Sequence, residues 1–252
     1  MNYLLAIDIG NTNITAGIFK GAKLLGKTKV PTSSCSSYIR RFKTFIKEAG
    51  LEVNRVDEAI VSSVVPLALA RLVVELRRMS GTIKITIVGR DLKVPVKNMY
   101  RIKNEVGQDR LVNAFAAKIL YGTPAVIVDF GTAITFDIIS KRGDYLGGLI
   151  LPGIELSLSG LYMKTALLPK VELKKASSII GKDTVNSMRG GILFGFGAMC
   201  DGLVTRYRRI LGRSAKVIAT GGNAKLMKRY AKSIQKIDED LTLKGLQLIS
   251  KV

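Results

Sequence analysis

Two strand–turn–strand segments of this chain carry the same pattern, and this internal duplication restricts the possible folds more than any other feature. The first, residues 4–19, runs from an apolar strand through Asp8-Ile-Gly10 and a small polar turn into a second strand. The second, residues 125–139, repeats the pattern with Asp129-Phe-Gly131. Glycine lets backbone N–H groups approach an anion, hydroxyls add donors, and an aspartate at a strand end can hold a cation. Each segment therefore has the chemistry of a phosphate-binding hairpin.

The spacing of the apolar residues predicts a similar order of elements after each hairpin. In the first half we predict an antiparallel meander of strands at 3–9, 14–19 and 23–30, then a helix at 33–50 with a serine cluster at its start, a strand at 59–65, a helix at 67–80 and a strand at 83–88. After a linker at 89–106, we predict a bridging helix at 108–121, strands at 125–129, 133–140, 145–150 and 215–220, and helices at 154–164, 184–211, 223–232 and 241–251. The pattern predicts an α/β protein with two lobes, residues 1–106 and 107–252.

The charge of the chain raises the question of anionic partners. Its 252 residues include 40 basic and 19 acidic ones, which gives a net charge of +21. The basic residues are scattered, however, and only 6% of residues are aromatic, so no stacking platform for bases is evident. We therefore favour a solvated basic surface and expect no specific nucleic-acid partner. No apolar run reaches the ~18 residues of a membrane span, and the opening run Tyr3–Ile7 is too short for a signal peptide, so we expect a cytoplasmic protein without membrane contact.

The composition also restricts the chemistry. The chain contains no histidine, which excludes a Ser-His-Asp triad and an imidazole base. Any general base must be a carboxylate, lysine, tyrosine or cysteine. Cys35 and Cys200 lie far apart and outside any Cys-x-x-Cys spacing, so we interpret both as buried thiols rather than as disulfide or zinc ligands.

Eight ordered sequence blocks resemble the type III pantothenate kinase family over nearly the whole chain. They are Asp8-Ile-Gly-Asn-Thr-Asn13, Gly107-Gln-Asp109-Arg110, Asp129-Phe-Gly-Thr132-Ala, Gly147-Gly-Leu-Ile-Leu-Pro-Gly153, Thr165-Ala-Leu-Leu-Pro169, Gly181-Lys-Asp-Thr184, Thr220-Gly-Gly222 and Asp238-Glu-Asp-Leu-Thr-Leu-Lys-Gly245-Leu. The Gly-x-Asp-Arg block is the most particular, whereas Thr-Gly-Gly is common to many ATPases. The resemblance implies two duplicated ribonuclease H-like lobes of the sugar kinase, actin and Hsp70 ATPase superfamily, with the nucleotide bound between them.

The resemblance further implies ATP-dependent phosphorylation of pantothenate to 4'-phosphopantothenate, the first step of coenzyme A synthesis. Asp109 is then the general base for the substrate hydroxyl; on the residues alone it is equally a helix N-terminal carboxylate or a partner of Arg110. Arg110 either orients the substrate and stabilises phosphoryl oxygens or forms a structural ion pair. The family pattern assigns these residues to pantothenate: Tyr100, Gly107, Gln108, Asp109, Arg110 and Thr184.

For the nucleotide, the resemblance assigns the first hairpin and one residue of the second to the phosphates: Asp8, Ile9, Gly10, Asn11, Thr12, Asn13, Ile14, Thr15 and Thr132. Asp8 is expected to help hold hydrated Mg²⁺, and Asp129 a monovalent cation, K⁺ or NH₄⁺; a strand-end aspartate capping a turn is the alternative for Asp129. Gly221-Gly222 either lies along the adenosine or forms a plain strand-to-helix turn. Family members are homodimers, which we expect here, with residues 147–168 and the helix at 184–211 supplying the interface.

Two alternatives to this kinase remain open at this point. One is a non-catalytic regulatory or polyanion-binding protein on the same fold. The other is a different phosphotransferase of the superfamily, such as a polyphosphatase or another small-alcohol kinase. The block Gly107-x-Asp109-Arg110 disfavours both.

Overall fold

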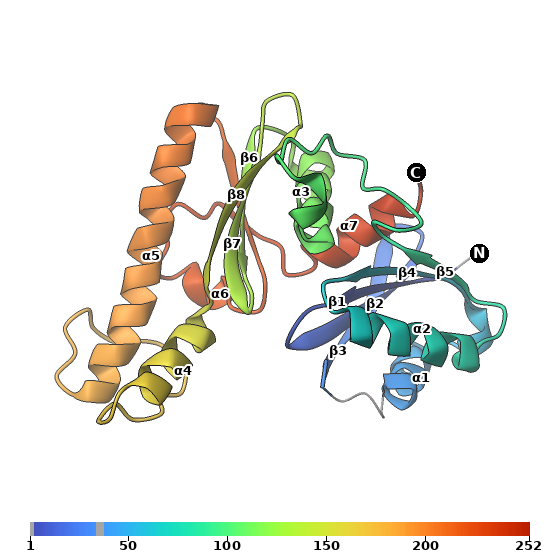
Figure 1. The fold of residues 1–252 in the computed structure, drawn as a ribbon, viewed down its shortest axis with the longest axis horizontal. Helices are drawn as coiled ribbons and strands as arrows, with labels where there is room; N and C mark the ends of the chain where they lie inside the picture. The colour runs from blue at the N-terminus through green and yellow to red at the C-terminus, as the bar shows by residue number, and fades with distance from the viewer. Residues whose placement is uncertain (1–2, 34–37) are drawn as a thin grey trace. The chain divides into compact units, whose positions relative to one another are not determined.

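The structure is a computed structural model that describes residues 3–33 and 38–252 (Figure 1). Its contacts divide the chain into two compact units that are interleaved in sequence. Unit 1 contains residues 1–96, 101–116 and 240–252, and unit 2 contains residues 97–100 and 117–239. The lobes 1–106 and 107–252 stay a prediction. The serine cluster at 34–37 and Cys35 lie outside the described residues.

Unit 1 is built on a five-stranded mixed sheet with the order β3-β2-β1-β4-β5. Its strands are β1 (Tyr3–Ile9), β2 (Asn13–Lys20), β3 (Lys23–Pro31), β4 (Val56–Ser63) and β5 (Lys84–Ile87). The first three form the predicted antiparallel meander, and short turns at Gly10 and Gly21 reverse the chain. Consecutive residues such as Leu5, Ala6 and Ile7 are buried in β1. β4 and β5 then add in parallel, each through a crossover helix.

Helices cover both faces of the unit 1 sheet (Figure 1). On one face, α1 (Tyr38–Glu48) and α2 (Pro66–Met79) bury apolar residues such as Phe42 and Leu72 against Leu5 and Ile7. On the other face lies α7 (Leu241–Ile249), whose Leu243 reaches Gly17 of β2. α7 crosses α3 (Gln108–Tyr121) closely. Two single 3₁₀ turns occur at Val53–Arg55 and Lys103–Glu105.

Unit 2 repeats the same topology in a second five-stranded sheet, with the order β10-β9-β6-β7-β8. Its strands are β6 (Ala125–Phe130), β7 (Ala133–Ile139), β8 (Tyr145–Pro152), β9 (Lys216–Thr220) and β10 (Lys236–Ile237), and its helices are α4 (Ile154–Lys164), α5 (Thr184–Leu211) and α6 (Ala224–Met227). β6, β7 and β8 form the antiparallel meander, and β9 runs parallel to β6. The long helix α5 lies along one face of this sheet, over a core that includes Val128, Phe136 and Val204 (Figure 1).

The sequence-based boundaries are correct for most elements and wrong for a few. β4 begins at Val56 rather than residue 59, and the helix predicted at 223–232 is only the single turn of α6, followed by turns around Tyr230. β10 was not predicted, because two residues carry no periodicity. None of the helices within residues 3–33 and 38–252 is both long and apolar enough to span a bilayer.

Candidate active site

The first hairpin forms at the end of β1, in unit 1. Asp8 pairs with Thr15 of β2 and with Ser62 of β4, so the carboxylate sits where two parallel strands end. The backbone N–H of Gly10 donates to the carbonyl of Asn13 over 2.9 Å, which closes the turn. Asn11 and Thr12 at its tip are exposed. Backbone N–H groups and hydroxyls at the end of a sheet are the donors that phosphates use.

A single residue after β3 supports this hairpin from the side. The Thr32 hydroxyl donates to the carbonyl of Gly10 over 2.7 Å, and its backbone N–H donates to the carbonyl of Thr12 over 3.0 Å. Thr32 itself is buried. The turn is therefore held from two directions before any ligand binds.

The second hairpin, in unit 2, repeats this geometry with one residue fewer in its loop. Asp129 pairs with Thr135 of β7 and with Thr220 of β9, as Asp8 pairs with Thr15 and Ser62. Thr132 is exposed at the tip, and its carbonyl accepts from the N–H of Gly153 over 3.1 Å. The two copies identified in the sequence thus occupy equivalent places in equivalent sheets.

Gly221 gives Asp129 its surroundings. A Cβ on Gly221 would lie 2.3 Å from Oδ1 of Asp129, and the backbone of Gly221 has a φ of +87°, so glycine is required on both grounds. Asp129 is partly buried beside this close approach of Gly221 to Phe130. A partly buried carboxylate at the end of a strand is a position that can hold a cation. Among the described residues, three or more acidic or cysteine side chains do not gather as a metal cage.

The Gly-x-Asp-Arg block begins α3 in unit 1. Asp109 lies in the first turn of the helix, and its Oδ1 accepts from the N–H of Arg110 over 2.9 Å. A Cβ on Gly107 would lie 2.4 Å from that same oxygen, and the side chain of Val64 packs on the other side. The N–H of Val64 donates to the carbonyl of Ile9 over 3.1 Å. Asp109 and the first hairpin are therefore joined through one residue, Val64.

The electrostatic environment of Asp109 is unusual for a carboxylate at a helix start. Burial raises the pKa of Asp109 above its ordinary value, against the smaller lowering influences of the Arg110 N–H and the Arg110 charge. The side chain of Arg110 is itself buried, with 6% exposure. A partly desolvated carboxylate beside a buried cation is typical of functional sites, although structural ion pairs also produce it.

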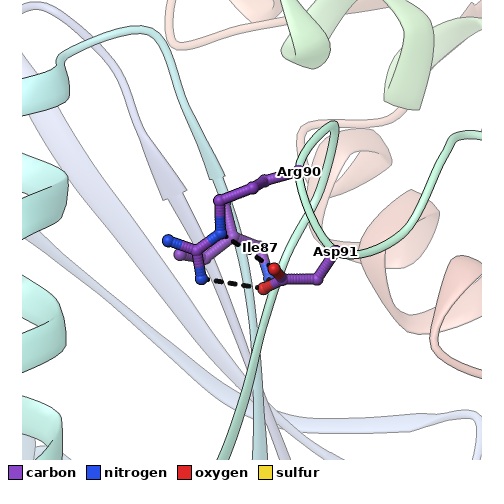
Figure 2. A network of polar contacts seen from close by, with 3 residues as sticks. All are labelled: Ile87, Arg90 and Asp91. Carbon is purple, nitrogen blue, oxygen red and sulfur yellow. Dashed lines mark hydrogen bonds and ion pairs between the residues drawn. The ribbon is translucent and has the colours of Figure 1, made fainter.

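A tight turn after β5 contacts the residue before Asp109, and the sequence indicated only a linker there. Asp91 accepts from the N–H of Ile87 over 2.8 Å and forms a two-pronged pair with Arg90 at 2.8 and 3.0 Å (Figure 2). The hydrogen bond with Arg90, and to a smaller extent that from Ile87, holds the pKa of Asp91 below its ordinary value. The turn brings Gly89, which has a φ of +88°, against the side chain of Gln108. A Cβ on Gly89 would lie only 2.6 Å from Cδ of Gln108.

Tyr100 lies in unit 2, on the meander of β7 and β8. Its ring packs on Tyr145 with centroids 6.3 Å apart and touches the position of Gly147, where a Cβ would be 3.1 Å away. The Tyr145 hydroxyl donates over 2.8 Å to Asp137, which is fully buried and also accepts from Thr135 over 3.0 Å. Sequence reasoning missed this support, although an aspartate inside the apolar run of β7 was a usable signal.

The structure places the remaining predicted residue, Thr184, at the exposed first position of α5. The carboxylate of Asp183 caps this helix by accepting from the N–H of Asn186 over 2.8 Å. Unit 1 thus brings together the Asp8–Thr15 hairpin and the block 107–110.

Unit 2 brings together Asp129, Thr132 and Gly221, and the ring of Tyr100 packs against residues of β8. The assignment of Thr184 to a substrate stays a prediction.

The duplicated sheets and their hairpins define an α/β fold of two actin-like lobes. Solved structures agree at the level of the fold. A Campylobacter jejuni protein provisionally described as a Baf family transcriptional activator superposes with a TM-score of 0.57 at 20% identity, over 98% of this chain and 96% of that one. The ethanolamine utilization protein EutJ from Carboxydothermus hydrogenoformans gives 0.57 at 14% identity, over 99% and 90%.

Sequence comparison is more specific. The family model of type III pantothenate kinase matches residues 4–206. The type III pantothenate kinases of Geotalea daltonii and Anaeromyxobacter dehalogenans are 40% and 41% identical over 249 residues, which cover 98% of this chain and 97% and 98% of theirs. The chain therefore belongs to the type III pantothenate kinase family, as its eight sequence blocks indicated.

Proposed function

We propose that this chain transfers the γ-phosphoryl group of ATP to the primary alcohol of pantothenate, with Asp109 as the general base. Family membership over nearly the full chain assigns pantothenate phosphorylation, the first step of coenzyme A synthesis. The observation that carries the residue assignment is the partly desolvated carboxylate of Asp109, held between Gly107 and the Arg110 N–H at the start of α3. It is a fixed acceptor in a chain that has no histidine.

The rate of phosphoryl transfer depends more on the position of the substrate hydroxyl than on the strength of the base. Phosphoryl transfer passes through a loose transition state in which little proton transfer is needed early, so a carboxylate suffices when the hydroxyl is well placed. Burial raises the pKa of Asp109, which makes it a better base than an exposed aspartate. Arg110 supplies positive charge to the substrate carboxylate or to the phosphoryl oxygens. Gln108, Gly107, Tyr100 and Thr184 complete the proposed substrate contacts.

The first hairpin and Thr132 are proposed to bind the phosphates of ATP. The exposed Asn11 and Thr12, and the backbone around Gly10, offer donors where the strands end. Asp8 offers one carboxylate at that point, and a hydrated Mg²⁺ is usually held by only one or two carboxylates together with substrate phosphates, so this residue fits. When bound, Mg²⁺ would neutralise charge on the phosphates.

Asp129 is proposed to hold a monovalent cation, K⁺ or NH₄⁺. Its partly buried carboxylate at the end of β6 supports this proposal. Such an ion would supply fixed positive charge beside Thr132 without taking part in proton transfer.

We also propose that the chain works as a homodimer through an apolar surface on β8 and α4. Six large apolar side chains there are between 40% and 65% exposed: Leu146, Leu149, Ile150, Leu156, Tyr162 and Met163. A contiguous exposed apolar surface commonly marks an interface. Sedimentation should show dimers at micromolar concentration, and Ile150→Glu with Met163→Glu should give monomers with reduced activity. Leu67→Glu, at a leucine of α2 that is 76% exposed, is the control and should stay dimeric. A wild-type monomer would contradict the proposal.

The reaction itself is tested by measuring ADP release with ATP and Mg²⁺ in the presence and absence of pantothenate. We expect ADP only with pantothenate, and a phosphorylated product in equal amount. ADP release without pantothenate would indicate another phosphotransferase or a phosphatase, and no turnover would indicate a non-catalytic member of the family. Asp57→Asn, at an exposed aspartate of the same unit, is the matched control for Asp109→Asn.

A further inference from the structure

Three segments of unit 2 meet at one end of its sheet: residues 117–124, 139–145 and 205–217. The Thr123 hydroxyl donates to the carbonyl of Lys141 over 2.9 Å, and the N–H of Lys216 donates to the carbonyl of Pro124 over 3.0 Å. A Cβ on Gly212 would lie 3.8 Å from the Lys141 ammonium nitrogen. The end of α3, the β7–β8 turn and the end of α5 therefore form one continuous surface.

This surface holds a concentration of positive charge that the sequence alone did not reveal. The three segments contain eight of the 40 basic residues and one of the 19 acidic residues, Asp144. We call the eight side chains the basic end: Lys118, Lys141, Arg142, Arg206, Arg208, Arg209, Arg213 and Lys216. Within residues 3–33 and 38–252, none of the eight takes part in an ion pair. Their charges are therefore not neutralised by the protein itself.

The basic end is separate from the second hairpin, which carries Thr132. β6 begins beside it at Ala125 and reaches the hairpin at Phe130, and six residues of strand span about 20 Å. Figure 1 shows the β7–β8 turn and the last turn of α5 at one end of this sheet, and the β6–β7 hairpin at the other. A phosphate bound at Thr132 would therefore lie beyond contact distance of these cations.

We propose that the basic end binds the sugar–phosphate backbone of double-stranded nucleic acid, without reading its sequence. Five of the eight cations are arginines, whose planar guanidinium groups match phosphate oxygens in pairs. The guanidinium of Arg208 already donates to the carbonyl of Ala215 over 3.3 Å, so the proposal rests on the other four. Arg206 and Arg209 are three residues apart on α5, so their side chains lie on one side of the helix, and Arg213 follows in the turn after Gly212. Phosphate contacts of this kind supply the sequence-independent part of nucleic-acid affinity.

The aromatic residues of the same segments favour a duplex over a single strand. Single strands are bound by stacking their bases on aromatic rings. Tyr121 donates its hydroxyl to Asp238, Tyr207 packs on Phe136 with centroids 6.2 Å apart, and Tyr145 is buried. These rings are engaged within the protein, which leaves phosphate recognition as the chemistry of this surface.

The experiment measures binding of the full-length protein to a fluorescent duplex of about 20 base pairs and arbitrary sequence, between about 50 and 200 mM salt. The patch variant carries Arg142→Gln, Arg209→Gln and Arg213→Gln. The control variant removes the same charge from exposed positions of α1, with Arg40→Gln, Arg41→Gln and Lys43→Gln. A single strand of equal length and vesicles rich in phosphatidylserine are the competing probes. Pantothenate kinase activity of both variants reports that they are folded.

We expect the patch variant to bind the duplex about tenfold more weakly or worse, with a salt slope smaller by roughly one for each cation removed. The control variant should lose less than about threefold, and the duplex should bind more tightly than the single strand. Equal losses in both variants would assign the binding to diffuse charge and overturn the proposal. Absence of duplex binding at low salt, tighter binding of the single strand, or binding of vesicles in place of the duplex would also overturn it. Vesicles are the main competitor, because the exposed side chain of Ile210 lies beside the arginines.

Discussion

Gly107→Ala tests whether the position of the Asp109 carboxylate controls the rate. The added Cβ would lie 2.4 Å from Oδ1 of Asp109, whereas an ordinary contact begins at about 3.5 Å, so the carboxylate must move by about 1 Å. That movement also disturbs the hydrogen bond from the Arg110 N–H to the same oxygen. A misplacement of about 1 Å in a catalytic constellation costs on the order of 10²-fold in rate, or about 2.7 kcal/mol of barrier. We expect a loss of this size in kcat.

The backbone of Gly107 does not itself require glycine, and the next contact of the new Cβ, with Val64, is an ordinary 3.5 Å. The fold should therefore survive, and the melting temperature and the KM for ATP should change little. The control is Gly81→Ala, because a Cβ at Gly81 meets nothing within 4 Å. Steady-state kinetics and thermal melts on both variants make the comparison. A kcat within about threefold of wild type for Gly107→Ala would refute the reasoning that this carboxylate must be held in place.

Three further predictions concern other parts of the molecule. Asp109→Asn should lower kcat by ~10²–10⁴-fold. Because burial raises the folded pKa of Asp109, the stabilising contribution of this group is present below its unfolded pKa of ~4 and is lost as the pH rises through the folded pKa. Urea denaturation should therefore show a higher free energy of unfolding for the variant than for the wild type at pH ~7, and no such difference at pH ~4. Asp129→Ala should remove the dependence of activity on K⁺, and full wild-type activity in sodium-only buffer would contradict this cation site. Gly245→Ala should destabilise by about 1–3 kcal/mol, since its Cβ would lie 2.8 Å from the Val112 carbonyl, and Gly202→Ala, in open space, should not.

The elements that depend on local pattern were predictable from the sequence. β1 was predicted over its full length, because its apolar run ends at a polar turn, and α5 was predicted from Thr184 to Leu211, between its acidic cap and Gly212. The two hairpins were predictable for the same reason, since each is a strand, a glycine turn and a strand. Local pattern also placed Asp109 in the first turn of a helix.

The features that depend on contacts far apart in the sequence were not predictable. The turn at Gly89 and Asp91 is defined by hydrogen bonds to Ile87 and by packing on Gln108, and neither leaves a periodic signal. The buried pair of Asp137 and Tyr145 joins two strands through side chains. The basic end escaped notice because its cations come from three separate segments, each of which resembles an ordinary solvated stretch.

The docking of α7 on unit 1 has a consequence for the order in which the molecule is made. Residues 240–252 complete unit 1: Leu243 fills the space beside Gly17, Thr242 donates to Asn113 over 2.7 Å, and Lys27 pairs with Asp240 at 2.6 Å. On the ribosome these residues emerge after all of unit 2, on the order of ten seconds later than the end of β5 at ordinary rates of synthesis. All of unit 2 has thus been synthesised while the sheet of unit 1, which was synthesised first, still exposes the apolar face that α7 will cover. The nascent chain must keep that face from pairing wrongly until the helix arrives.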